Sequence, residues 1–198
     1  MDPEHTRIRL GTGTIALQEA VNIVVDRFHW VMIGMLNLAI FFLCSFAYRS
    51  FLAGVILLVP VNLSHQAMIA TMHVLGVGLD VNSLIVAAIG VGVGIDYGIY
   101  LLSRICEEVR QQPDNWAGAI HDSIHTTGKA IAFTASIMIV GILPVYLLSG
   151  LRFVADMGLL ILFIMLINMI AALVVLPSLV ALFKPAFVAR ESASDWGT

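Results

Sequence analysis

The sequence has few charged residues for its length. They make up 12% of the 198 residues, whereas an average soluble domain contains about 25%. Hydrophobic residues make up 60% of the chain, and the mean hydropathy is +0.97. This composition is typical of an integral membrane protein and excludes an ordinary soluble domain.

Cysteines and metal-ligand clusters are also scarce. Cys44 and Cys106 are the only cysteines, which excludes a disulfide framework or a zinc site built from cysteines. His121 and His125 have the spacing of one helix face, but zinc needs roughly three or four ligands and no clear third ligand lies beside them. We therefore expect no metal and no cofactor. The net charge of -3, without a basic stripe, argues against nucleic acid as a partner.

Residues 1–27 are the main hydrophilic region of the N-terminal part. They contain no basic region followed by a short apolar core and a cleavage site, so we expect no cleavable signal peptide. Apolar residues recur at roughly helical spacing from Ile15 to Val25. This pattern predicts an amphipathic helix that lies on the membrane or leads into it.

Five apolar segments are long enough to cross a membrane, for which about 20 residues suffice. The sequence therefore predicts an all-α fold, a polytopic membrane helix bundle within a transmembrane domain of residues 28–184. An amphipathic cytoplasmic linker is predicted at 104–129 and a polar tail at 185–198. The predicted transmembrane helices are residues 28–47, 51–75, 83–103, 130–148 and 153–176.

The segment 51–75 carries Pro60 and several polar residues. Their spacing places them on one helix face, which should point into the protein. Two interpretations stay open. The polar side chains either satisfy backbone groups freed by the proline, or they line a substrate path. The residues on this face are Asn62, His65, Gln66, Ile69 and His73.

The segment 83–103 contains one carboxylate, Asp96, well inside an apolar run. A charge in the bilayer interior costs several kcal/mol, so an acid kept there indicates a functional site or, alternatively, a buried structural hydrogen bond. The glycines Gly90, Gly94 and Gly98 predict a smooth stripe along which a neighbouring backbone approaches closely. A second row on the same helix comprises Gly92, Asp96, Tyr100 and Ser103.

Helical rise predicts a polar layer at the depth of Asp96. At about 1.5 Å per residue, Asp96 lies about 10 Å from the inner end of its helix. Thr134, Ser136 and Asn168 fall at about 8–13 Å, so these side chains could share one layer. A carboxyl group in a dry environment is protonated more readily. We predict that Asp96 takes up a proton on one side and releases it on the other, and that its charge change alters packing along the glycine stripe.

The distribution of basic residues predicts the orientation. If the first helix runs from outside to inside, only Arg152 lies in the short outer loops. The positive-inside rule then places the C-terminus in the cytoplasm. Arg7, Arg9 and Arg27 in the outer N-terminal segment count against this orientation, although the acids there outnumber them. The basic residues of the inner loops and tail are Arg49, Arg104, Arg110, Lys129, Lys184 and Arg190.

The stretch GVGIDYGIYLLSR, from Gly92 to Arg104, resembles the GxxxDY signature of resistance-nodulation-division (RND) transporters, especially the MMPL-like lipid exporters. Gly92, Asp96 and Tyr97 match the motif, and the resemblance implies that Asp96 and Tyr97 relay protons. It also implies that Thr134 is a partner of the acid. The downstream AIHDSIHTTGKAIAFTASIMIVGILP and LPSLVALF resemble the last helices of one RND half.

The resemblance covers about residues 28–185, equivalent to the second to sixth helices of one RND half. It implies a multi-pass protein of a bacterial inner membrane that exports lipids or hydrophobic compounds, uses the proton motive force and is not an enzyme. The implied partners are the lipid bilayer, protons, a lipid or hydrophobic substrate, and a second RND half. That half would come from a longer form of the same chain, from a homodimer or from another protein.

Two other classes of membrane protein share part of this pattern. Intramembrane aspartyl proteases carry GxGD, but GVGID at Gly92–Asp96 is one residue out of register. Such proteolysis needs a second intramembrane carboxylate, whereas Asp80 and Asp156 fall at the membrane edges. A non-transporting lipid-sensing module, similar to the sterol-sensing domain, shares the RND helix arrangement and stays open as an alternative. A pH-dependent ligand flux would distinguish a transporter from a sensor.

Overall fold

The computed structural model of the protein describes residues 14–75 and 81–189. The described residues form helices and short connections, and no strand occurs among them, so the all-α prediction is confirmed. Five helical segments are long and apolar enough to cross a membrane. These segments are Phe28–Ala47, Phe51–Val74, Leu84–Gln111, Trp116–Leu148 and Val154–Phe183.

Helix α1, Thr14–Ala47, includes the amphipathic segment predicted ahead of the membrane. That segment is continuous with the first membrane span, because no proline interrupts the helix between Thr14 and Ala47. The part of the prediction concerning residues 1–13 lies outside the described residues. A tight turn follows, in which Arg49 has a positive φ of 50°.

Helix α2, Phe51–Leu75, contains Pro60 without a break. The Asn62 side chain donates to the Leu58 carbonyl at 2.9 Å, and Ser64 Oγ donates to the Pro60 carbonyl at the same distance. Both bonds stay within α2, but neither reaches the Ile56 carbonyl, which is the group that Pro60 leaves without a backbone donor.

The polar face of α2 also contacts α1. Asn62 and Asn37 exchange two amide hydrogen bonds of 3.0 and 3.1 Å, and the buried His65 ring stacks on His29 with centroids 5.3 Å apart. Gln66 and His73 are exposed, however. The prediction that the whole face points inward is therefore wrong for these two residues. The side of α2 that packs against other helices is narrower than the predicted polar face.

Helix α3, Val81–Gln111, extends past the predicted end at Ser103. Arg104 pairs with Glu107 at 2.7 Å and also with Glu108, at the i,i+3 and i,i+4 spacings that stabilise helices. Residues 104–111, the first part of the predicted linker, therefore belong to α3. Polarity marks the end of an apolar span, but it does not stop a helix.

The rest of that linker belongs to the next helix. Asn115 caps α4, Trp116–Ser123, by accepting a hydrogen bond from the Gly118 amide at 3.0 Å. The helix continues through a π-helical segment, η2, Ile124–Gly128, into α5, Lys129–Leu148. The predicted amphipathic helix thus exists, but it is the first part of a long span whose buried Ala119 and Ile120 pack near α3.

The final span consists of α6, Arg152–Ile170, the π-helical η3, Ala171–Val175, and α7, Leu176–Phe183. Pro177, the residue after the predicted end of this helix at 176, lies in the first turn of α7. A proline is tolerated there because the π-helical segment changes the hydrogen-bond register just before it. The span ends at Lys184, which is left-handed with a φ of 39°. The short α8, Ala186–Ala189, follows.

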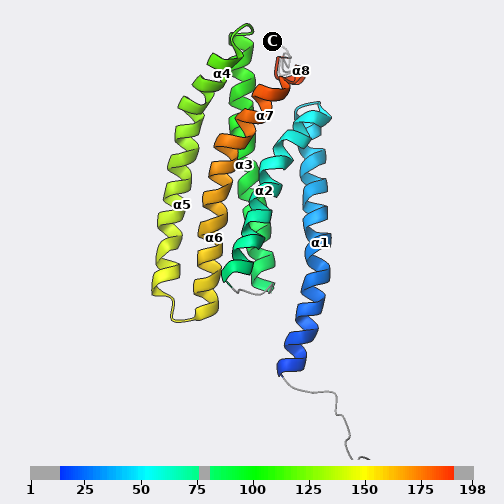
Figure 1. Cartoon of the computed structure of the whole chain (residues 1–198), viewed down its shortest axis with the longest axis vertical. Helices are drawn as coiled ribbons and strands as arrows, with labels where there is room; N and C mark the ends of the chain where they lie inside the picture. The colour runs from blue at the N-terminus through cyan, green and yellow to red at the C-terminus, as the bar shows by residue number, and fades with distance from the viewer. Residues whose placement is uncertain (1–13, 76–80, 190–198) are drawn as a thin grey trace, which may run out of the picture.

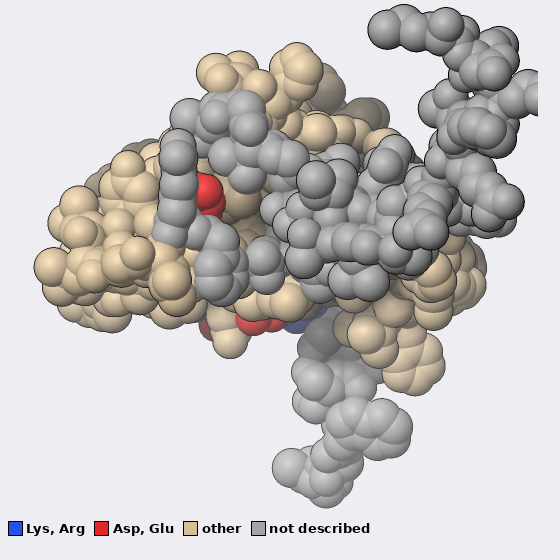
Figure 2. Space-filling model, turned by 90° about the horizontal axis from the view of Figure 1, so that it is seen from below, with Lys and Arg blue, Asp and Glu red and all other residues tan. Residues whose placement is uncertain are grey.

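Helix α3 is at the centre of the bundle, where it contacts α2, α6, α4, α1 and α8. Figure 1 shows α5 and α1 at opposite edges, and α4, α8 and the α1–α2 turn at one end. Helix α5 packs mainly against α6, and α1 mainly against α2. Seen from the opposite end, most of the visible described surface belongs to uncharged residues (Figure 2).

Candidate functional site

One face of α3, which we call the acidic face, is exposed along its length. Its residues follow one another at steps of three or four, so they line up along the helix. A Cβ atom added at Gly92 would meet no atom within 4 Å, and Tyr100 is 63% exposed. In the part of the chain that the structure describes, no helix covers this face. The acidic face comprises Ile85, Ile89, Gly92, Asp96, Tyr100, Ser103 and Glu107.

Asp96 itself is exposed within this chain. The alternative that it makes a buried structural hydrogen bond does not fit this position. A carboxylate at the level of an apolar span is costly when it faces lipid, so the acidic face needs a polar or protein environment in the membrane.

The glycine stripe lies on another side of α3, in close contact with α6 and α2. Asn168 on α6 is buried, and its side-chain amide donates to the Gly90 carbonyl at 2.7 Å. A Cβ atom at Gly94 would lie 2.6 Å from Asn168 Oδ1, and one at Gly98 would lie 3.0 Å from Leu57 Cδ2. The structure therefore places side chains of α6 and α2, rather than a neighbouring backbone, against Gly90, Gly94 and Gly98.

The side chains of the predicted polar layer have different surroundings. Asn168 faces the glycine stripe rather than the acidic face. Ser136 is exposed, and its hydroxyl donates to the Ala132 carbonyl of its own helix at 2.7 Å. Thr134 instead lines a pocket together with Tyr97. A similar depth in the membrane thus does not place these side chains in one cluster.

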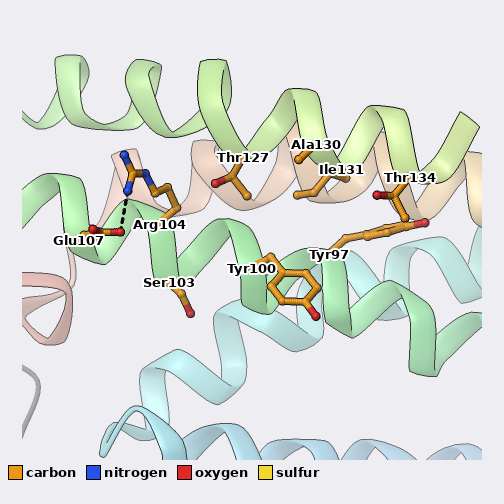
Figure 3. A pocket seen from close by; sticks show the side chains of 9 residues that line it. All are labelled: Tyr97, Tyr100, Ser103, Arg104, Glu107, Thr127, Ala130, Ile131 and Thr134. Carbon is orange, nitrogen blue, oxygen red and sulfur yellow. Dashed lines mark hydrogen bonds and ion pairs between the residues drawn. The ribbon is translucent and has the colours of Figure 1, made fainter. Parts of the chain in front are cut away.

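That pocket, which we call the α3–α5 pocket, has a volume of about 460 Å³. Figure 3 shows the Tyr97 side chain extending from α3 towards Thr134 on α5. The Tyr97 hydroxyl is buried, and none of the described residues forms a hydrogen bond with it. The lining residues are Tyr97, Tyr100, Ser103, Arg104, Glu107, Thr127, Ala130, Ile131 and Thr134.

The pocket runs along α3 from the Arg104–Glu107 ion pair at one end to Tyr97 and Thr134 at the other. Tyr97 and Thr134 were predicted as site residues and both line this pocket, whereas Arg104, Glu107 and Thr127 line it without having been predicted. A signal for Glu107 was present, since it continues the helical row of Asp96, Tyr100 and Ser103.

Tyr48, in the turn after α1, fixes the end of the acidic face. Its hydroxyl donates to the Ile99 carbonyl at 3.2 Å and lies 2.7 Å from Ser103 Oγ. Burial raises the pKa of Tyr48 to about 12. The phenol therefore stays protonated at neutral pH, as its donated hydrogen bond requires.

His121 and His125, considered above as metal ligands, are both exposed, with ring centroids 4.6 Å apart. Within the described ranges no group of three or more histidine, cysteine, aspartate or glutamate side chains could hold a metal ion. Cys44 and Cys106 are free and buried.

The sequence model of the MMPL family matches residues 2–196. The trehalose monomycolate exporter MmpL3 of Mycolicibacterium smegmatis is 35% identical over 63 residues, which is 32% of this chain and 6% of that protein. The putative membrane protein SCO6666 of Streptomyces coelicolor is 30% identical over 95 residues, 48% of this chain and 13% of its own length. The putative membrane protein MJ1562 of Methanocaldococcus jannaschii is 28% identical over 150 residues, 73% of this chain and 38% of its own.

The chain thus spans well under half the length of each of these relatives. No solved structure gives a significant match.

Proposed function

The chain belongs to the MMPL family of membrane proteins, and from this premise we propose that it is membrane machinery of a proton-driven exporter of lipids or other hydrophobic compounds. Its similarity to a trehalose monomycolate exporter supports a lipid substrate. The observation that carries the proposal is the exposed Asp96 on the acidic face of α3, beside Tyr97 and the α3–α5 pocket. We propose transport and no enzymatic activity.

The acidic face is the surface on which a second RND half would pack. Gly92 leaves open space above the helix, and Asp96 and Tyr100 project from the same face. Covering this face with a second half would remove Asp96 from contact with lipid and give it polar partners. The half would come from the same chain in a longer protein, from a homodimer or from a partner protein.

Asp96 and Tyr97 would relay the proton, with Thr134 as the partner on α5. The Tyr97 hydroxyl is buried and lies at the end of the pocket where Thr134 lines it, so it is placed to exchange a proton with a group on α5. Protonation of Asp96 would remove a charge from the acidic face and let the covering half approach more closely. Deprotonation would restore the charge and favour a more hydrated arrangement.

Coupling to movement would proceed through the other side of α3. The helix is tied to α6 by Asn168 and the tightly packed glycines. A shift of α3 would therefore move α6, because neither Gly90 nor Gly94 has space to absorb the displacement. We further propose that the protein resides in a bacterial inner membrane with its C-terminus in the cytoplasm.

The test uses the whole protein in liposomes made from lipids of its source membrane, with an imposed pH gradient. An entrapped pH-sensitive dye reports proton movement, and mass spectrometry reports lipid released to an external acceptor. We expect Asp96→Asn to reduce both signals at least tenfold. Asp156→Asn, at the start of α6, is the matched control and should keep both.

Full proton-coupled lipid release by Asp96→Asn would refute the relay. Lipid binding without any pH-dependent flux, in the wild type and the variant alike, would instead support the lipid-sensing alternative.

A further inference from the structure

The π-helical segments η2 and η3 lie against each other. η2 joins α4 to α5, and η3 joins α6 to α7. A Cβ atom added at Gly128, the last residue of η2, would lie 3.1 Å from Leu173 Cδ2 in η3. On either side of this contact α5 packs against α6, and α4 packs against α7. Short π-helical segments inside longer helices are frequently found at functional sites.

Pro177 holds η3 in its π-helical register. In an uninterrupted α-helix this proline would offer no donor to the Leu173 carbonyl, and its ring would clash with that carbonyl. A π-helical turn just before the proline avoids both costs. The Ser178 hydroxyl also donates to the Val174 carbonyl at 2.6 Å. The sequence therefore fixes the register of η3.

η2 contains no proline, so an α-helical register is open to it. Its π-helical register is supported by a hydroxyl instead. Thr126 Oγ1 donates to the Asp122 carbonyl at 2.8 Å and lies 3.4 Å from the Ser123 carbonyl oxygen. Such bonds to a carbonyl one turn earlier are local and often bend a helix. Because a single hydroxyl is a weaker constraint than a proline ring, η2 can change its register whereas η3 cannot.

A change of register in η2 would turn the whole of α5. A π-helical turn holds about one residue more than an α-helical turn, since its hydrogen bonds join residues i and i+5. If η2 becomes α-helical while α4 stays in place, each residue of α5 takes the place of the residue that follows it. This movement is a turn of about 100° around the helix axis and a shift of about 1.5 Å along it.

The packing of α5 is compatible with this turn. The buried side chains of α5 are those of Ile131 and Ala135, and Ala130 and Thr134 would take their places. Ala130 is smaller than Ile131, which offsets the larger volume of Thr134 one turn along the helix. At the other end of α5, a Cβ atom added at Gly150 would meet no atom within 4 Å, so the connection to α6 has room to adjust.

We propose that α5 turns between these two registers, and that in the α-helical register Phe133 replaces Thr134 at the end of the α3–α5 pocket beside Tyr97. Phe133 is 70% exposed in the π-helical register, where it lies outside the pocket. In the α-helical register its phenyl ring faces Tyr97 instead of the Thr134 hydroxyl, and it closes that end of the pocket. The control of the proton relay by this movement rests on the proposed function, whereas the movement itself does not.

The test compares the labelling rates of Thr134→Cys and Ala135→Cys in the whole protein in its native membrane. Both variants carry Cys44→Ala and Cys106→Ala, and mass spectrometry measures their reaction with a membrane-permeant methanethiosulfonate reagent. In the π-helical register position 134 is exposed and position 135 is buried. We therefore expect Thr134→Cys to react at least tenfold faster. Ala135→Cys should still react to completion, because α5 visits the other register.

Deletion of His125, an exposed residue of η2, removes the additional residue and fixes the α-helical register. We expect the order of the two labelling rates to reverse in this background. His125→Ala keeps the length of the chain and is the matched control, which should preserve the original order. Thr126→Val removes only the hydroxyl, and it should raise the labelling rate of Ala135→Cys at least threefold. Thermal unfolding shows which variants are folded, and Thr126→Val serves as the test if the deletion variant is not.

An unchanged order of rates in a folded deletion variant would overturn the proposal. Complete protection of Ala135→Cys in the chain of normal length would overturn it too, as would a Thr126→Val variant that labels at the original rate. The rates are measured without a pH gradient and without a transported substrate. A failure of the register change is therefore distinguished from a failure of the proton relay.

Discussion

The glycine stripe and the acidic face are two sides of one helix, and among the described residues only the glycine stripe is packed against other helices. Gly90, Gly94 and Gly98 are packed against α6 and α2, with Asn168 hydrogen-bonded across the contact. Gly92 and Asp96, on the acidic face, are exposed. Glycine thus has different roles at positions two residues apart. At Gly94 it permits a contact with Asn168, whereas at Gly92 no atom of the described residues lies within 4 Å of an added Cβ atom.

The same contrast appears in hydrogen bonding. The glycine side buries the amide of Asn168 and satisfies it with the Gly90 carbonyl. In the α3–α5 pocket beside the acidic face, the buried Tyr97 hydroxyl and Arg104 Nε have no hydrogen-bond partner among the described residues. Buried polar groups in proteins are nearly always satisfied by protein, water or ligand. We therefore expect the functional site at the acidic face of α3 and the α3–α5 pocket beside it.

Replacing a glycine by leucine on each of the two faces should give the largest difference in stability. Gly94→Leu places a side chain where Asn168 Oδ1 lies only 2.6 Å from a Cβ atom. We expect it to separate α3 from α6 and to cost about 3 kcal/mol or more of stability. Gly92→Leu, with open space around it, should leave thermal unfolding of this chain unchanged. Equal destabilisation by both variants would contradict the comparison.

A smaller effect should follow from removing the polar link on the glycine side. Asn168→Ala deletes the hydrogen bond to the Gly90 carbonyl and leaves a small cavity. We expect a loss of about 1–2 kcal/mol in the free energy of unfolding. Ser136→Ala, whose hydroxyl bonds only within its own helix, should change it by less than about 0.5 kcal/mol. Unfolding titrations in mixed micelles measure both, and a neutral Asn168→Ala would argue against a tight α3–α6 contact.

The smallest effect concerns Tyr48, which holds Ser103 at the end of the acidic face. Because the pKa of Tyr48 rises from 10.0 to about 12 on folding, its contribution to stability is fully present below pH 10.0 and is lost as the pH approaches about 12. The unfolding temperature of the wild type should therefore fall more steeply than that of Tyr48→Phe across this interval. Parallel pH profiles for the two proteins would rule out this role.

Much of the fold was predictable because it depends on patterns within short segments of the sequence. Apolar runs of sufficient length predicted the five spans, and the spacing of Gly90, Gly94 and Gly98 predicted a close helix contact. The partner of that contact was not predictable, since nothing near the glycines indicates that Asn168 would lie against them. The continuation of the last span past residue 176 was not predictable either, because no local pattern indicates the π-helical segment before Pro177.

The site was predictable only in part, for a similar reason. The position of Asp96 in an apolar run made it a candidate site residue, but periodicity cannot say whether a helix face is covered or exposed. Arg104 and Glu107 were read as the end of a span, although their ion pair continues the helix and forms one end of the pocket. The polar layer was inferred from depth alone, and depth does not determine the direction in which Ser136 or Asn168 points.

The most direct test of the proposed second half is to identify what covers the acidic face in the membrane. The photoreactive residue p-benzoylphenylalanine is placed at Ile89, which lies on this face and is 44% exposed, and at Ile137 on α5, which is 56% exposed, as the control. Irradiation of the whole protein in its native membrane is followed by mass analysis of the products. We predict protein cross-links from position 89 and lipid adducts from position 137. Lipid adducts alone at both positions would contradict the claim that a second half completes α3.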